Sequence, residues 1–292
     1  MTSLVRGCLM ALAMLAGTPS IAQVQQRTVA FAEKAAAVQL NVRVQGNGPL
    51  VVLIPSLGRG AADFDALGAR LAAAGYTAAA IDPRGIGGSS GPPPQTLFDL
   101  AGDVAAVIEA LAPAGPDGAP RPAIVIGHAL GNRIARTLAS AHPAKVSQLI
   151  LLASGGQVPI APAITKAMGD VFDTSLSPKA HIAAVKAAFF APGNDPEVWR
   201  DGWYPAVAQA QERAVRATAP GKWTNSGAAP VLIVQAMDDA IAPPANAEAL
   251  QRAAPDRVEI VILQHAGHAM LPEQPGKLAD IVLKRLTKAP RL

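Results

Sequence analysis

Residues 124–132 read IVIGHALGN, and this stretch decides how the rest of the chain is interpreted. An apolar run is followed by a turn between Gly127 and Gly131, and a helical pattern begins at Asn132. Glycines on both sides of such a turn let a strand and a helix approach closely, and they leave the middle residue, Ala129, in a strained backbone conformation. The stretch therefore predicts a strand, a sharp turn and a helix in direct succession.

Strands and helices alternate on both sides of this turn. Several expected strands are continuous apolar runs, which is typical of strands buried on both faces of a parallel sheet. The pattern predicts an α/β fold with a mostly parallel sheet flanked by helices. The expected strands cover residues 38–44, 50–54, 77–81, 123–126, 146–153, 231–235 and 258–263, and the expected helices cover 61–74, 97–111, 132–141, 245–253 and 277–286.

The residues from about 156 to 226 interrupt the alternation. They are helical in character and contain all three tryptophans of the chain. We expect a helical cap over one end of the sheet, inserted between core segments 28–155 and 227–292, where it can exclude water and shape a pocket. Aromatic residues of the cap can line that pocket or form a small core of the cap itself. The candidates for an apolar pocket wall are Trp199, Trp203 and Tyr204.

Composition narrows the classes of protein that remain. The chain has 292 residues, of which 50% are hydrophobic and 16% are charged, and its formal net charge is +4. Basic residues do not cluster, which argues against binding to nucleic acid. The histidines lack the spacing of metal ligands, so we expect no metal and no cofactor. A small-molecule substrate is the expected partner, and the sequence does not indicate an oligomeric state.

The first 22 residues have the pattern of a secretory signal peptide. Arg6 precedes an apolar segment that is too short to span a bilayer, and Ser20-Ile21-Ala22 fits the small-x-small cleavage rule. Cleavage after Ala22 would remove the only cysteine, Cys8, and leave residues 23–292 as a periplasmic or secreted domain. No later stretch is long and apolar enough to predict a membrane span.

The turn and its surroundings resemble the α/β-hydrolase superfamily, whose corresponding turn is G-x-S-x-G with the serine as nucleophile. The resemblance runs from about residue 38 to residue 286 and implies the α/β-hydrolase fold. The order nucleophile, acid, histidine also fits. Asp239 lies four residues before Pro243 and matches the family's acid, with Asp238 as the alternative, and His268 matches the family's histidine.

The same resemblance implies the groups around this triad. The backbone N–H groups of Leu57 and Leu130 occupy the positions at which the superfamily stabilises an oxyanion. Ser56 and His128 are expected to line the pocket, whereas His265 is expected to be structural. Ser56 is the best substitute nucleophile among the other serines, although it does not lie in a turn of the required kind.

The sequence departs from the superfamily at the nucleophile position, which holds Ala129. Alanine has no group that can attack a carbon, so a serine acyl-enzyme route is closed. Three interpretations stay open. His268, oriented by Asp239, could activate a water for attack on a small activated substrate; the protein could be a catalytically silent binding module; or Ala129 could be an engineered replacement of a serine.

A narrower resemblance favours the first interpretation. Residues 127–131, GHALG, resemble the turn of the aminoacrylate hydrolases of pyrimidine degradation, which also carry alanine there. Ser56-Leu57-Gly58 and Arg84-Gly85-Ile86-Gly87 are similar to loops of that group. This resemblance implies hydrolysis of a small enamine or carbamate-like acid as the type of chemistry. An export signal fits poorly with that pathway, so the substrate itself stays open.

Overall fold

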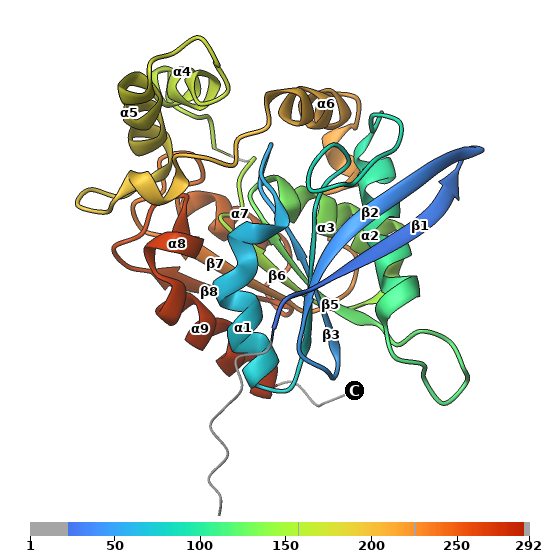
Figure 1. Cartoon of the computed structure of the whole chain (residues 1–292). Coiled ribbons are helices and arrows are strands. Elements are labelled where there is room, and N and C mark those ends of the chain that lie inside the picture. The colour runs from blue at the N-terminus through green and yellow to red at the C-terminus, as the bar shows by residue number, and fades with distance from the viewer. Residues whose placement is uncertain (1–22, 157, 225, 289–292) are drawn as a thin grey trace, which may run out of the picture.

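The computed structural model describes residues 23–156, 158–224 and 226–288, and the predicted signal peptide lies outside these ranges. At its centre is an eight-stranded sheet (Figure 1). The strands are β1 (Gln25–Glu33), β2 (Ala36–Gln45), β3 (Leu50–Ile54), β4 (Thr77–Ile81), β5 (Ala123–His128), β6 (Val146–Leu152), β7 (Val231–Ala236) and β8 (Val258–Leu263). Their order across the sheet is β1-β2-β4-β3-β5-β6-β7-β8. β2 is antiparallel to both of its neighbours, and the other adjacent pairs are parallel.

Helices cover both faces of this sheet, which confirms the predicted fold class. Alternate side chains of β3 enter different cores: Leu50, Val52 and Ile54 pack in one, and Val51 and Leu53 pack in the other. The first core is completed by α2 (Leu97–Leu111), α3 (Leu130–Ala141) and α7 (Ala245–Ala253). The second is completed by the 3₁₀ turn η1 (Ala61–Phe64) and by α1 (Asp65–Ala73), α8 (Met270–Glu273) and α9 (Pro275–Lys288).

One strand of the sheet was not among the expected elements. β1 forms a hairpin with β2 through Lys34 and Ala35, which both have positive φ angles. It is an edge strand, and Val29 is its one buried residue. A strand that buries so little apolar surface lacks the hydrophobic pattern on which the sequence prediction depends.

The chain between β6 and β7 forms a helical layer over the carboxyl ends of the strands (Figure 1). Its aromatic residues pack together with Ile241 and Ala269 of the core loops. The layer therefore shares a hydrophobic cluster with the rest of the chain, and the boundaries 156–226 of a separate cap stay a prediction. Its elements are α4 (Pro162–Asp170), α5 (Pro178–Phe189), η3 (Pro196–Trp199), α6 (Pro205–Arg216) and η4 (Pro220–Lys222).

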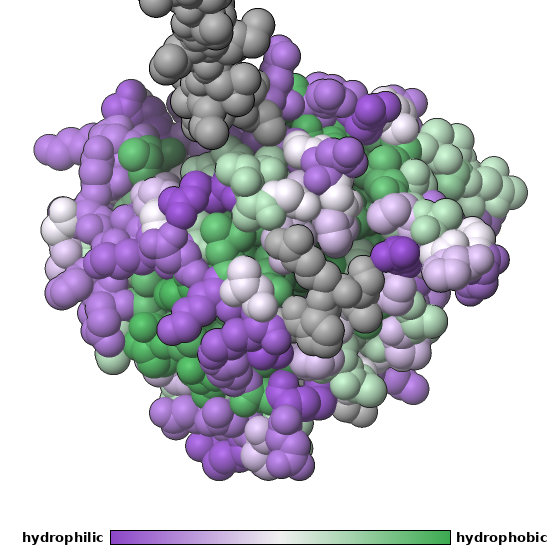
Figure 2. All heavy atoms as spheres, turned by 90° about the horizontal axis from the view of Figure 1, so that it is seen from below, coloured by the Kyte–Doolittle hydropathy of each residue, from purple (hydrophilic) through white to green (hydrophobic). Residues whose placement is uncertain are grey.

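The opposite side of the molecule, seen from below in Figure 2, carries many hydrophilic side chains with apolar surface visible between them. Within the described ranges, no helix has the length and the apolar character needed to cross a bilayer.

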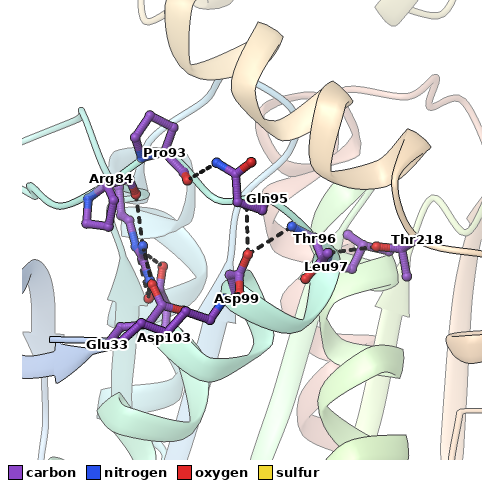
Figure 3. Close-up of polar contacts among 11 residues, drawn as sticks. Glu33, Arg84, Pro93, Gln95, Thr96, Leu97, Asp99, Asp103 and Thr218 are labelled. Atoms are coloured by element: carbon purple, nitrogen blue, oxygen red, sulfur yellow. Dashed lines mark hydrogen bonds and ion pairs between the residues drawn. The ribbon is translucent and has the colours of Figure 1, made fainter. Parts of the chain in front are cut away.

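A buried ion-pair network ties the β1–β2 hairpin to α2 (Figure 3). The guanidinium of Arg84, in the loop after β4, donates to Asp103 of α2 at 2.6 Å and to Glu33 of β1 at 2.8 Å. One turn earlier, the carboxylate of Asp99 accepts from the backbone N–H of Thr96 at 2.9 Å and caps the start of α2. The network holds three segments that are distant in sequence against one another.

Replacing Asp103 by asparagine should lower the free energy of unfolding by about 3 kcal/mol, because it leaves a buried guanidinium with reduced charge compensation. Asp280→Asn is the matched control, since Asp280 pairs with Arg70 at 2.6 Å on the surface and its side chain is 69% exposed. That control should change stability by less than about 0.5 kcal/mol. Urea unfolding measures both values, and equal effects would contradict the assignment of a structural role to the Arg84 network.

Candidate active site

The turn between β5 and α3 has the strained geometry predicted from the sequence. Ala129 lies at φ 51° and ψ −105°, a conformation that residues with a Cβ rarely adopt. The flanking glycines are required by close backbone contacts. A Cβ on Gly127 would overlap the carbonyl oxygen of Gly131, and a Cβ on Gly131 would overlap that of Ile54. The turn therefore presents Ala129 at the carboxyl end of the central strands.

His268, in the loop after β8, pairs with Asp239, in the loop after β7. The imidazole Nδ1 lies 2.9 Å from one carboxylate oxygen of Asp239 and 3.1 Å from the other, and both side chains are buried. The carboxylate also accepts from the backbone N–H groups of Ile241 at 2.9 Å and Ala242 at 2.7 Å. These bonds fix the carboxylate, so His268 Nδ1 donates to it and Nε2 is the nitrogen available for chemistry. The alternative acid, Asp238, is exposed and does not reach His268.

Glu273 holds the loop that carries His268, and the sequence interpretation gave it no role. Its carboxylate accepts from the backbone N–H groups of Gly267 and Ala191, each at 2.7 Å. Burial raises the pKa of Glu273. Because Ala191 follows α5, these bonds also connect the histidine loop to the helical layer. A sequence signal for this role was available, because Glu273 lies in the segment Pro272-Glu273-Gln274-Pro275 soon after His268.

A cavity of about 310 Å³ lies between these loops and the helical layer. It brings together five of the predicted site residues. The wall is largely apolar, and its residues come from the loops after the strands, from the start of α3 and from the helical layer. Predicted residues on the wall are Ser56, Leu57, Ala129, Leu130 and His268; the others include Arg133, Ile160, Met168, Phe172, Phe189, Glu212, Val215, Arg216 and Ile241.

The backbone N–H groups of Leu57 and Leu130 are available at this cavity. Neither donates to another residue in the described part of the chain. The loop that carries Leu57 is held in place by α6, because the N–H of Gly58 donates to the buried Gln211 side chain at 2.8 Å. The arrangement leaves two fixed donors beside Ala129.

Three aromatic residues that the sequence suggested for the pocket wall lie elsewhere. Trp199 and Trp203 pack against each other with ring centroids 5.7 Å apart, and the guanidinium of Arg59 lies over both rings at 4.3 and 4.6 Å. Tyr204 is 39% exposed at the start of α6. Packing against each other and against Arg59 turns the two tryptophans away from the cavity, Tyr204 is exposed, and Phe172 and Phe189 form the aromatic wall instead.

His128 is also absent from the cavity wall. It is fully buried, and its Nε2 donates to the backbone carbonyl of His268 at 2.8 Å, while its Nδ1 has no partner among the described residues. Burial, with a smaller contribution from the neighbouring His268, lowers the pKa of His128 to about 3. A neutral His128 therefore positions the backbone of His268. His265 is exposed, and its backbone carbonyl accepts from the side chain of Gln274 at 2.9 Å.

Replacing Ala129 by glycine should raise the free energy of unfolding by about 1 kcal/mol. The reason is that release of backbone strain outweighs the extra chain entropy of glycine. Ala139→Gly, in the interior of α3, should lower the free energy of unfolding by at least about 1 kcal/mol. Urea unfolding of both variants gives the signs, and a loss of stability in Ala129→Gly would contradict the strain.

His128 should also make the protein less stable in acid. Its pKa is lower in the folded protein than its ordinary value of 6.5, so only the unfolded chain takes up the proton as the pH falls from 6.5 toward 3. The free energy of unfolding should then fall by about 1.4 kcal/mol per pH unit over this range. Denaturation of wild type and His128→Gln at pH 7, 6 and 5 tests this, and equal slopes for the two proteins would contradict it.

Known proteins share this fold and parts of this sequence. A family model described as serine aminopeptidase, S33, matches residues 47–275. The 2-(acetamidomethylene)succinate hydrolase of Mesorhizobium japonicum is 34% identical over 118 residues, which span 39% of each chain. A protein of Variovorax paradoxus that carries the name of a carbamate hydrolase, RutD, is 28% identical over 256 residues, 79% of this chain and 89% of that one.

Solved structures show the same architecture. The structure of a thermophilic esterase from Thermogutta terrifontis is 21% identical, with a TM-score of 0.71 over 91% of this chain and 99% of the esterase. At that identity the likeness shows the fold, while the family match covers most of the sequence, including the turn, the acid and the histidine. The chain therefore belongs to the S33 serine aminopeptidase family of α/β-hydrolases.

Proposed function

We propose that this protein hydrolyses a small, activated substrate by direct attack of a water molecule, without a serine nucleophile. The observation that carries the proposal is the Asp239–His268 pair, which is intact and buried beside Ala129 at the cavity. A hydrolase family, a complete acid–histidine pair and an alanine at the nucleophile position are together consistent with a general base that acts on water.

The reaction proceeds in two steps. His268 Nε2 removes a proton from a water molecule as its oxygen attacks the electrophilic carbon, and Asp239 stabilises the imidazolium that forms. The oxyanion accepts hydrogen bonds from the N–H groups of Leu57 and Leu130. The intermediate then collapses, and the imidazolium returns the proton to the leaving group. The missing hydroxyl of Ala129 provides the space for the attacking water.

The expected rate enhancement limits the substrate. A general base contributes about 10²- to 10⁴-fold, and one oxyanion donor contributes about 2.7–4 kcal/mol. These contributions suit an ester, lactone or carbamate that is already electrophilic, or an enamine that reacts as its imine tautomer, and they are too small for an ordinary amide. The names of the relatives, a succinate-derivative hydrolase and a carbamate hydrolase, support a small-molecule substrate. From the predicted signal peptide we also propose that the activity lies in the periplasm or outside the cell.

A catalytically silent binding module is the second candidate. It is favoured by Ala129 itself, because a relative that kept the fold and the cavity after losing the nucleophile would have this sequence. If Ala129 is instead an engineered replacement of a serine, restoring that serine should give the site full activity.

Hydrolysis of 4-nitrophenyl acetate, a small lactone and a small carbamate by wild type, His268→Ala and Ala129→Ser distinguishes these cases. We expect wild type to turn over at least one substrate without forming an acyl-enzyme detectable by mass spectrometry. His268→Ala should lose at least about 10²-fold in rate, because it removes the general base. His142→Ala is the control, since His142 is an exposed histidine at the end of α3.

Two other outcomes would contradict direct attack by water, and each supports one of the alternatives. Turnover by Ala129→Ser alone, with an acyl-enzyme, identifies a serine hydrolase that has lost its nucleophile. Absence of turnover in all three proteins favours the binding module.

A further inference from the structure

Arg133 is a cationic residue on the cavity wall to which the proposed mechanism gives no role. It follows Ala129 by four residues, so it lies about one helical turn along α3 from the reacting position. Its guanidinium lies 5.1 Å from the ring of Trp223. Among the described residues, no carboxylate and no other acceptor forms a hydrogen bond or an ion pair with this guanidinium.

The neighbouring Arg136 shows what a structural arginine looks like in the same place. Its guanidinium lies 4.9 Å from the same Trp223 ring, and it donates to the hydroxyl of Ser226 at 2.8 Å and to the carbonyl of Thr224 at 2.5 Å. Burial lowers the pKa of both arginines, and both stay charged at neutral pH. Two cations thus share one indole, but only Arg136 donates hydrogen bonds to described residues.

The other charged residues on the cavity wall do not compensate the positive charge of Arg133. Arg216 and Glu212 are one turn apart on α6 and pair with each other at 3.2 Å, on a side of the cavity where both are exposed. Their charges cancel, so the wall has a net charge of about one positive unit, located at Arg133. A partly buried charge without a partner is costly, and a ligand anion would remove that cost.

We propose that Arg133 binds the carboxylate of the substrate, which is therefore a short monoanionic acid. This inference rests on the proposed function, because it takes the same cavity as the substrate site. Arginine binds a carboxylate through two parallel N–H···O bonds and so fixes its orientation. With the carboxylate at Arg133 and the electrophilic carbon at Ala129, a spacer of only a few bonds fits between them. Among the described residues of the cavity wall, Arg133 is the one arginine without a paired carboxylate, so the wall offers one position for a carboxylate and favours a monoanion over a dicarboxylate.

Equilibrium binding tests the inference without relying on turnover. The probes are butyrate, its neutral analogue butyramide and the dianion succinate, and the readout is tryptophan fluorescence, checked by calorimetry. Wild type should bind butyrate at least about tenfold more tightly than butyramide, and succinate no more tightly than butyrate. Arg133→Met should abolish the preference for butyrate over butyramide.

Arg213→Met is the matched control. Arg213 is an exposed residue of α6 that is not on the cavity wall, so this variant loses the same charge and should bind butyrate within about twofold of wild type. Arg133→Gln serves as a second variant, and circular dichroism establishes that each variant is folded. The preference for butyrate should be lost in both folded Arg133 variants.

Equal binding of butyrate and butyramide by wild type, including no binding of either, overturns the inference. A preference that survives in Arg133→Met or Arg133→Gln also overturns it, as does a stronger binding of succinate. Failure of the proposed function has a different result: the Arg133-dependent preference for butyrate is present, but no substrate is hydrolysed in a His268-dependent way.

Discussion

The close approach of β5 and α3 at Gly127 and Gly131 is the constraint on which the rest of the site depends. The backbone of the turn contacts the end of β3 at Ile54, and there is no room for a side chain on either glycine. This contact forces Ala129 into its strained conformation and places it at the carboxyl edge of the sheet. The strain persists although the residue carries no reactive group, because packing of the strand against the helix imposes it.

The loops of the site are fastened to this turn and to one another. His128, within the turn region, holds the backbone of His268, and Glu273 holds the same loop from its other side. Gln211 fixes the loop after β3 from the helical layer. The groups proposed for chemistry are therefore positioned by buried polar side chains from different parts of the chain. Such satisfied networks make a site rigid.

The charges at the site fall into two groups. Asp239 has its hydrogen bonds satisfied by His268 and by two backbone N–H groups, so it serves orientation. Arg133 has no such partners among the described residues and faces the cavity. A hydrolase site that satisfies its anion internally and leaves a cation open is suited to an anionic substrate. The apolar wall around it favours a small molecule with little other polar surface.

Local sequence patterns were sufficient to predict most of the fold and the acid–histidine pair of the site. The apolar runs predicted the parallel strands, and the glycine spacing predicted the strained turn at Ala129. These two signals are contained in a few consecutive residues and reflect backbone geometry or burial, which is why they can be read without the structure. Asp239 and His268 were identified through the resemblance of their loops to the α/β-hydrolase superfamily.

Tertiary packing alone decided the remaining features. β1 buries too little apolar surface to have a pattern of its own, and it is ordered by pairing with β2. Trp199 and Trp203 were expected on the cavity wall, but the direction of a side chain depends on what its segment packs against, and both turn toward Arg59. The open guanidinium of Arg133 is likewise invisible in the sequence, because the presence or absence of a partner is settled only when distant segments meet.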